Sequence, residues 1–236
     1  MTTTRRVFAS TDALAAELVD NTISAAETAI ARRGIFTMAL TGGSVVGAVY
    51  PVLAQAALPW HKVHVFFGDE RSVPPDHTDS NFKLATDTLL GLPSVRGLHV
   101  HRIRGEDDAV SAALAYEREL LDVTDGTGSL DVVHVGMGPD GHVCSLFPEH
   151  ALLREERRLV MPILDSPKPP SSRVTLTLQA LSRARELFFL VTGAAKAEAV
   201  ADAVLNPSST LPVARAARRA ATARWLLDSD AARLLK

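Results

Sequence analysis

Four short, largely apolar segments of the chain each run into a glycine at or just after their end. They cover residues 35–40, 63–67, 131–135 and 187–191, and the glycines are Gly42, Gly68, Gly136 and Gly193. Segments of this length and composition are typical of strands that are buried on both faces, as in a parallel sheet. Because helical patterns alternate with strands from Ile35 onward, we predict a doubly wound, three-layer αβα sandwich with a mostly parallel sheet.

The remaining elements are predicted from apolar periodicity and from residues that break helices. Helices are expected at 11–33 with Gly34 ending it, at 46–53, from about Phe82, at 109–121, at 196–204, and from Val213 through Arg224. Further strands are expected at 98–103, 158–164 and 173–178. Residues 68–81 are predicted to be a long polar loop, since adjacent prolines exclude a helix there, with Asp79 or Ser80 capping the helix that follows.

The composition is that of an ordinary globular protein, with 47% hydrophobic and 22% charged residues among 236. We expect a single domain that spans residues 1–236. The net charge of −2 gives no reason to expect nucleic acid or a membrane as a partner. The expected assembly is a monomer or a weak homo-oligomer. One cysteine excludes an intramolecular disulfide, and the N-terminus lacks the apolar run of a signal peptide, so we predict a cytoplasmic protein.

The segment 134–148 carries the strongest signal for a functional site. Its glycines at 136, 138 and 141 allow a sharp turn that brings backbone amides close to a ligand. Asp140 and His142 lie in that turn. A carboxylate and an imidazole two residues apart suit proton transfer near neutral pH, because histidine titrates there and a carboxylate can fix its orientation.

A second candidate is the turn Thr41-Gly-Gly-Ser44 between a predicted strand and a predicted helix. Such a turn points free backbone amides and a helix dipole at one spot, which makes an anion site. It lacks both the Walker lysine and the dinucleotide-binding glycine spacing, so a tight turn without a ligand is an equally good interpretation from the residues alone.

No persuasive metal or cofactor site is present in the sequence. His99 and His101 lie on one face of a predicted strand, but no third ligand follows at a recognisable spacing. The histidines at 134, 142 and 150 lack the i, i+4 pairing of a helical zinc site. We therefore predict no metal and no cofactor.

Taken together, these motifs resemble the 6-phosphogluconolactonases, in the superfamily that includes glucosamine-6-phosphate deaminase and isomerase. The resemblance runs nearly end to end. It rests on Thr41-Gly-Gly-Ser44, Gly68-Asp-Glu-Arg-Ser-Val-Pro74 with His77 and Ser80-Asn81, Gly136-Met-Gly-Pro-Asp-Gly-His-Val-Cys-Ser-Leu-Phe-Pro148, Arg173-Val-Thr-Leu-Thr177 and Gly193-Ala-Ala-Lys196. Two positions depart from the family pattern, since Val45 replaces a threonine and Phe67 replaces a frequent tryptophan.

The resemblance implies hydrolysis of 6-phospho-D-glucono-1,5-lactone to 6-phospho-D-gluconate, a step of the oxidative pentose phosphate pathway. His142 would activate water, and Asp69 and Arg71 would line the sugar end. The phosphate would be held by Gly42, Gly43 and Ser44 together with Arg173 and Lys196. The phosphate roles of Arg71, Arg173 and Lys196 stay interchangeable at this point.

Several alternatives remain open. Asp140 either orients His142 or caps a following helix. Cys144 or Ser145 is a weaker candidate for a nucleophile, because neither lies in a G-x-S-x-G motif. A deaminase or isomerase would use Asp69 as its base, although this chain has Arg71 where that group typically has tyrosine. A non-catalytic sugar-phosphate sensor is the alternative from another class.

Overall fold

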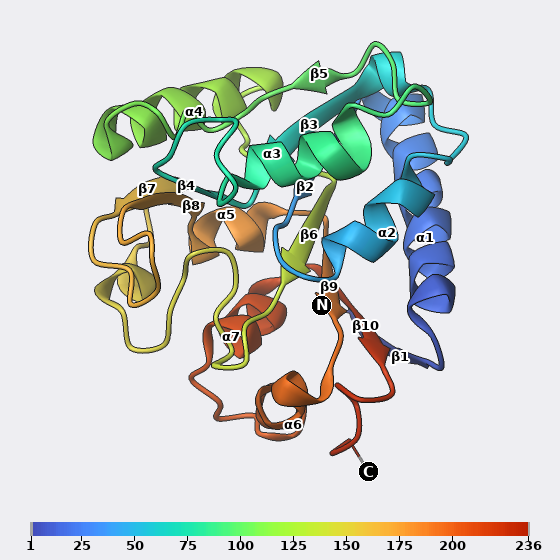
Figure 1. The fold of residues 1–236 in the computed structure, drawn as a ribbon, viewed down its shortest axis with the longest axis vertical. Coiled ribbons are helices and arrows are strands. Elements are labelled where there is room, and N and C mark those ends of the chain that lie inside the picture. Colours follow the sequence, from blue (N-terminus) through green and yellow to red (C-terminus); the bar gives the residue numbers. More distant parts are fainter. Residues whose placement is uncertain (1, 236) are drawn as a thin grey trace.

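The computed structural model describes residues 2–235, and its core is a seven-stranded sheet in which neighbouring strands are parallel (Figure 1). From edge to edge the strands are β1 (Thr2–Phe8), β10 (Thr222–Asp228), β9 (Glu186–Val191), β6 (Val132–Gly136), β2 (Phe36–Leu40), β3 (Val63–Phe67) and β5 (His99–Val100). The central strands are almost wholly buried, which explains why their sequences are so apolar.

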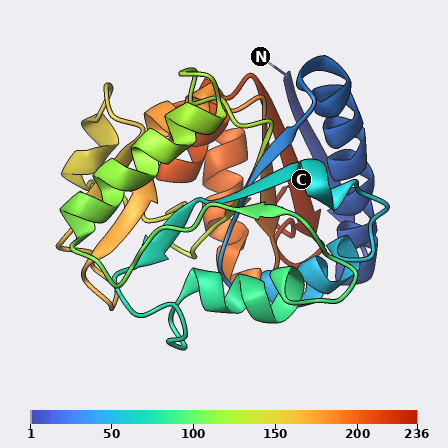
Figure 2. The ribbon, with the colours of Figure 1, turned by 90° about the horizontal axis from the view of Figure 1, so that it is seen from above.

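Helices cover both faces of this sheet, so the predicted α/β sandwich is confirmed. The helices are α1 (Thr11–Arg33), α2 (Val46–Leu53), α3 (Asn81–Ala85), α4 (Ala109–Val123), α5 (Leu178–Arg183), α6 (Ala197–Leu205) and α7 (Pro212–Arg219). Single turns are η1 (Trp60–Lys62), η2 (Thr86–Leu90), η3 (Ala151–Arg154) and η4 (Ala194–Lys196). Helix α1 packs against α2 on one side, and α5, α6 and α7 pack together on the other (Figure 1). Figure 2 shows α1 alongside the edge strand β1.

The order of the strands reverses between β2 and β6. The chain runs from β2 outward to β3 and β5, and then crosses back to place β6 on the opposite side of β2. In a doubly wound sheet, the loops at such a reversal diverge and leave a crevice at the carboxyl ends of the strands. The predicted glycine loops after β2, β3, β6 and β9 therefore start from the same edge of the sheet.

A small antiparallel sheet lies beside the main one and corrects the prediction of one uninterrupted loop at 68–81. Strand β4 (Asp69–Arg71) pairs with β8 (Arg173–Leu176), which pairs with β7 (Val160–Ile163). In this register Arg71 lies opposite Arg173. Three residues are too few to show an alternating pattern, so the strand is defined by its partner and not by its own sequence.

Two elements, one near each end of the described residues, differ from the prediction. Strand β1 was not predicted, because all its residues except the last are exposed and it shows no buried face. The last helix was predicted to reach Arg224, but α7 ends at Arg219 and Arg224 lies on β10, where it pairs with Glu186. The alanine-rich sequence favours helix, and pairing with β9 and β1 overrides that preference. The strand predicted at 98–103 shortens to β5.

The helix boundaries follow from capping residues. Ser10 accepts a hydrogen bond from the Ala13 backbone at the start of α1, and Gly34 ends that helix with a φ of 82°. At the start of α3, Ser80 accepts from the Lys83 backbone, so Ser80 and not Asp79 is the cap. No helix between residues 2 and 235 is long and apolar enough to cross a bilayer.

Asp131, just before β6, ties three elements together below the site. Its side chain is 3% exposed. One carboxylate oxygen accepts from the backbone and hydroxyl of Thr37 on β2, both at 2.9 Å. The other faces Arg33 of α1 at 2.5 Å and Arg185 at 3.2 Å. The carboxylate therefore joins α1, β2 and the entry to β9.

We predict that Asp131→Ala lowers the free energy of unfolding by about 2–4 kcal/mol, because it leaves a buried Thr37 amide without its acceptor. Urea unfolding of the purified variant measures this. Asp20→Ala, on the exposed face of α1, is the matched control and should stay within about 0.5 kcal/mol of the parent. Equal losses in the two variants would contradict the role given to Asp131.

Candidate active site

A cavity of about 190 Å³ opens at the carboxyl-terminal edge of the central strands. This volume is below the range for drug-sized ligands and suits a small metabolite. The lining comes from the loops after β2, β3, β6 and β9 and from the small sheet: Thr41, Gly42, Gly43, Ser44, Val45, Asp69, Arg71, Asn81, Gly136, Met137, Gly138, His142, Cys144, Arg173 and Lys196. Every predicted site residue except Asp140 lines this cavity.

The turn at Gly42, Gly43 and Ser44 connects β2 to α2 as predicted, and it presents backbone groups to the cavity. Gly43 has a φ of 97°, a conformation that favours glycine. A Cβ atom on Gly42 would overlap the side-chain amide of Asn81, so that position also requires glycine. Helix α2 has no side-chain cap, and its Val46 and Ala48 amides donate to the carbonyls of Gly43 and Val45. Among residues 2–235 the amides of Gly43 and Ser44 in the turn have no acceptor, so these are the N–H groups that can bind an anion.

Hydrogen bonds behind the turn hold it in place. The Tyr50 hydroxyl accepts from the Thr41 backbone at 2.9 Å. The Thr41 hydroxyl in turn accepts from the Gly136 backbone at 2.9 Å. The loops after β2 and β6 are thus joined at the point where the strand order reverses, and the turn is rigid before any ligand arrives.

Asp69 is a buried carboxylate in the cavity wall, with 6% of its surface exposed. It accepts hydrogen bonds from the Ser145 hydroxyl at 2.6 Å and from the Asn81 amide at 3.1 Å. These two donors fix the orientation of the carboxylate. Ser145 is fully buried and its hydroxyl proton is committed to Asp69, which does not suit a nucleophile.

Cys144 lines the cavity, but burial raises the pKa of its thiol well above the ordinary value, and Asp69 adds to the effect. The thiolate is the reactive form of cysteine, so a raised pKa leaves this side chain inert near neutral pH.

Three cationic side chains reach the cavity from separate elements. Arg71 donates to the Asp79 carbonyl, and its Nε is buried without a hydrogen-bond partner among residues 2–235. Arg173, 5% exposed, donates through Nε and Nη2 to the carbonyls of residues 168–170, each at 3.0 Å. Burial lowers the pKa of Lys196, and Asp228 partly opposes that shift. Each cation is therefore partly desolvated and suited to an anionic ligand.

His142 and Asp140 form the expected pair. Asp140 Oδ1 lies 2.5 Å from His142 Nδ1. Residues 141–150 form turns and one isolated bridge, so the alternative in which Asp140 caps a following helix is wrong. The His142 ring occupies the space that a Cβ on Gly138 would take, which explains the glycine there. The pair fixes the imidazole and leaves Nε2 as its second nitrogen.

The surroundings of His142 favour its neutral form. Burial lowers its pKa below the ordinary 6.5, while the Asp140 hydrogen bond and charge oppose the shift, Lys168 adds to it and Asp69 opposes it. Burial would raise the pKa of Asp140, but the bond with His142 and the charge of Lys168 outweigh burial and lower it. A neutral imidazole beside an ionised carboxylate is the form that accepts a proton.

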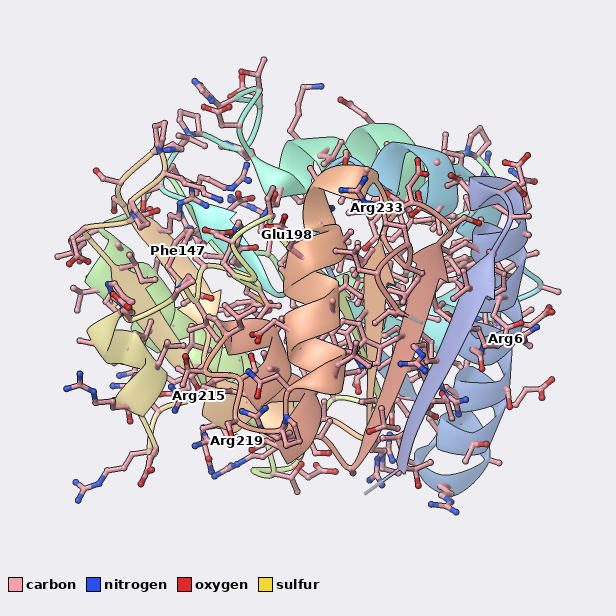
Figure 3. All side chains as sticks on the ribbon, turned by 90° about the horizontal axis from the view of Figure 1, so that it is seen from below. Arg6, Phe147, Glu198, Arg215, Arg219 and Arg233 are labelled. Atoms are coloured by element: carbon pink, nitrogen blue, oxygen red, sulfur yellow. The ribbon has the colours of Figure 1, made fainter. Side chains whose placement is uncertain are left out.

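Two residues of this site were missed in the sequence. Asn81 orients Asp69 and fills the space above Gly42. In the sequence it stood in the Ser80-Asn81 motif and beside the Ser80 cap, but no role was assigned to it. Lys168 contacts both members of the His142 pair from the proline-rich loop, residues 165–172, where no pattern marked it. Phe147, labelled in Figure 3, lies against the His142 ring with 4.9 Å between centroids.

Within residues 2–235, no group of three or more His, Cys, Asp or Glu side chains is arranged to hold a metal ion. His64, His99 and His101 do lie together, but as stacked rings.

Comparison with known proteins identifies the family of the chain. The chain is 41% identical to the 6-phosphogluconolactonase of Mycobacterium tuberculosis, covering 98% of each protein. It is 39% identical to a probable chloroplastic 6-phosphogluconolactonase of Oryza sativa, over 97% of this chain and 75% of that protein.

Solved structures also show the similarity of this chain to 6-phosphogluconolactonases. The 6-phosphogluconolactonase of Trypanosoma brucei superposes with a TM-score of 0.87 at 28% identity, covering 100% of this chain and 99% of that one. A monomeric glucosamine-6-phosphate deaminase shares the fold, with a TM-score of 0.77 at 20% identity over 99% and 100% of the two chains. Residues 9–225 match the family described as glucosamine-6-phosphate isomerases/6-phosphogluconolactonase, and the chain belongs to that family.

Proposed function

We propose that this protein hydrolyses 6-phospho-D-glucono-1,5-lactone to 6-phospho-D-gluconate, a step of the oxidative pentose phosphate pathway. The observation that carries the proposal is the His142–Asp140 pair in a cavity that also presents a glycine turn and cationic side chains. A phosphorylated lactone needs a base at its ester and positive charge at its phosphate. The names of the full-length relatives support the same substrate.

In the proposed reaction, His142 Nε2 takes a proton from a water molecule as that water attacks C1 of the lactone. Asp140 accepts a hydrogen bond from the Nδ1–H group of His142, which holds the ring in the tautomer that leaves Nε2 free. The ester carbonyl becomes a tetrahedral oxyanion, and Arg71 is the cation proposed to stabilise it. Collapse of this intermediate breaks the bond between C1 and the ring oxygen, and His142 returns its proton to that oxygen, which gives the open-chain acid. Asp69, fixed by Ser145 and Asn81, would accept from a sugar hydroxyl at the reacting end.

The phosphate is proposed to bind where Gly42, Gly43 and Ser44 offer backbone N–H groups and a hydroxyl. Lys196 would supply charge there, since its ammonium has no hydrogen-bond partner among the described side chains and Asp228 is the carboxylate that acts on it. Arg173 would assist through Nη1, whose one hydrogen-bond partner among residues 2–235 is the Ser145 hydroxyl at 3.4 Å. Binding the dianion would offset the desolvation of these cations.

The test of the function is a comparison of two substrates. Hydrolysis of freshly generated 6-phosphogluconolactone is followed against its spontaneous opening, with glucosamine 6-phosphate as the second substrate. Acceleration of lactone opening alone supports the proposal. Turnover of the amino sugar alone would favour the isomerase or deaminase branch of the family, and no turnover of either would favour a sensor.

Replacing the base should affect the chemical step. We expect His142→Asn to lower kcat by roughly 10²–10⁴-fold, the usual contribution of a general base, while the fold is kept. Steady-state kinetics at high enzyme concentration and short times separate this loss from spontaneous opening. His61→Asn, an exposed histidine before β3, is the control and should keep the parent rate. A parent-like rate in His142→Asn would remove His142 from the mechanism.

The pH dependence follows from the same residue. His142 must be neutral to accept a proton, and burial lowers its pKa below 6.5. We therefore expect the acidic limb of kcat/KM, which falls about tenfold per pH unit below the His142 pKa, to have its midpoint below pH 6.5. A fall that begins above pH 7 would contradict this assignment.

The phosphate contact is tested by substrate preference. Lys196→Ala should lower kcat/KM for the 6-phosphorylated lactone roughly 30- to 1000-fold, the effect of losing one charge-assisted contact, while the poor rate on plain gluconolactone is kept. Lys62→Ala, before β3 and therefore at the opposite edge of the sheet, is the control. If both lactones slow equally in Lys196→Ala, Lys196 serves the reacting end or the fold.

A further inference from the structure

Lys168 contacts both members of the His142–Asp140 pair. Its Nζ lies 3.1 Å from Asp140 Oδ2 and 3.2 Å from His142 Nδ1. Asp140 Oδ1 is occupied by His142, so both oxygens of this carboxylate have a partner. Lys168 does not line the cavity, and 42% of its side chain is exposed. It therefore lies behind the pair and acts on the reaction through it.

The loop that carries Lys168 is held at several points. The Ser166 hydroxyl donates to the Lys168 carbonyl at 2.8 Å and accepts from the Lys168 backbone at 3.3 Å. Arg173 donates to the carbonyls of Lys168, Pro169 and Pro170. Three of the five N–H groups of the Arg173 guanidinium thus donate to this loop. A lysine on a loop anchored in this way has a defined position.

Phe147 links the loop to the pair. Its ring is 1% exposed and lies 4.9 Å from the His142 ring. Lys168 Nζ lies 6.0 Å from its centroid and the Arg173 guanidinium 5.7 Å. Figure 3 labels Phe147. The His142 imidazole and the two cations therefore all lie near the buried ring of Phe147.

The charges around His142 act in opposite directions. Asp140 from its own loop and Asp69 from β4 favour the imidazolium, whereas Lys168 from the proline-rich loop and burial favour the neutral ring. Lys168 also donates to Asp140, which fixes the carboxylate that orients the ring. One ammonium thus orients Asp140 and adds to the effect of burial in favouring the neutral form of His142.

We propose that Lys168 is a positioning residue of this site, which fixes Asp140 through Oδ2 and lowers the pH below which His142 stops acting as a base. The inference rests on the proposed function for its kinetic test, but the geometry and the titration of His142 do not depend on the substrate. Lys168 opposes the charge that His142 gains as it takes a proton from water, so it restrains the base as well as orienting it.

The kinetic test compares Lys168→Met with Lys168→Arg. Lys168→Met should lower kcat about tenfold and change KM little, because the side chain does not line the cavity. The acidic limb of its pH profile of kcat/KM should shift to higher pH by about 0.5–1 unit. The shift is this small because Lys168 is partly exposed to solvent, which screens its charge. Lys168→Arg keeps the positive charge, so its acidic limb should lie at the pH of the parent and it should keep most of the parent kcat. Lys62→Met is the matched control, and its kcat and the acidic limb of its kcat/KM profile should equal those of the parent.

A titration without substrate separates this inference from the proposed function. NMR of the histidine side chains, with the His142 signal assigned by its loss in His142→Asn, gives the protonation midpoint directly. The midpoint should rise by about 0.5–1 pH unit in Lys168→Met and stay in place in Lys168→Arg. Thermal unfolding confirms that each variant is folded.

The outcomes are distinct. If the parent does not accelerate lactone opening, the proposed function is wrong, and the titration still decides the role of Lys168. An unchanged His142 midpoint in folded Lys168→Met overturns the inference. An equal shift in Lys168→Arg also overturns it, because the charge would then not be its cause.

Discussion

The parallel pairing of β2 with β3 on one side and β6 on the other is the interaction on which the site depends. In this ladder Leu40 lies opposite Phe67, and the Gly68 backbone donates to the Leu40 carbonyl at 2.9 Å. The loops that begin at Thr41 and Gly68 therefore leave the sheet at the same level. A slip of one residue would turn every following side chain to the other face of the sheet.

The sequence was informative where local chemistry determines the structure. The glycines after β2 and β6 are required by φ or by close approach, and the buried strands are apolar because both of their faces are covered. The positions of the cavity-lining residues followed from those loops, since parallel strands end at one edge. Their individual roles did not follow, because a role depends on which partner each side chain meets.

Partners that are distant in sequence account for the rest. Strand β4 exists through its pairing with β8, and β1 and β10 through pairing with each other. The sequence showed no sign of a role for Lys168 for the same reason. Its ammonium meets Asp140 only because its loop is held by Arg173, and both partners are distant or unpatterned in the sequence. The same pairing of β4 with β8 places Arg71 opposite Arg173, an unfavourable cross-strand contact that is consistent with a site built for an anion.

The pairing of β1 with β10 has a consequence for how the protein folds. Phe8 lies opposite Asp228, so β10 inserts between β9 and a segment that is very distant from it in sequence. Within residues 2–235, β1 has no strand to pair with until β10 is in place. Contacts of such long sequence separation slow folding and leave apolar strand edges exposed in the meantime. Completion of this side of the sheet is therefore a late step of folding, and until then the edge of β9 that faces β10 stays unpaired.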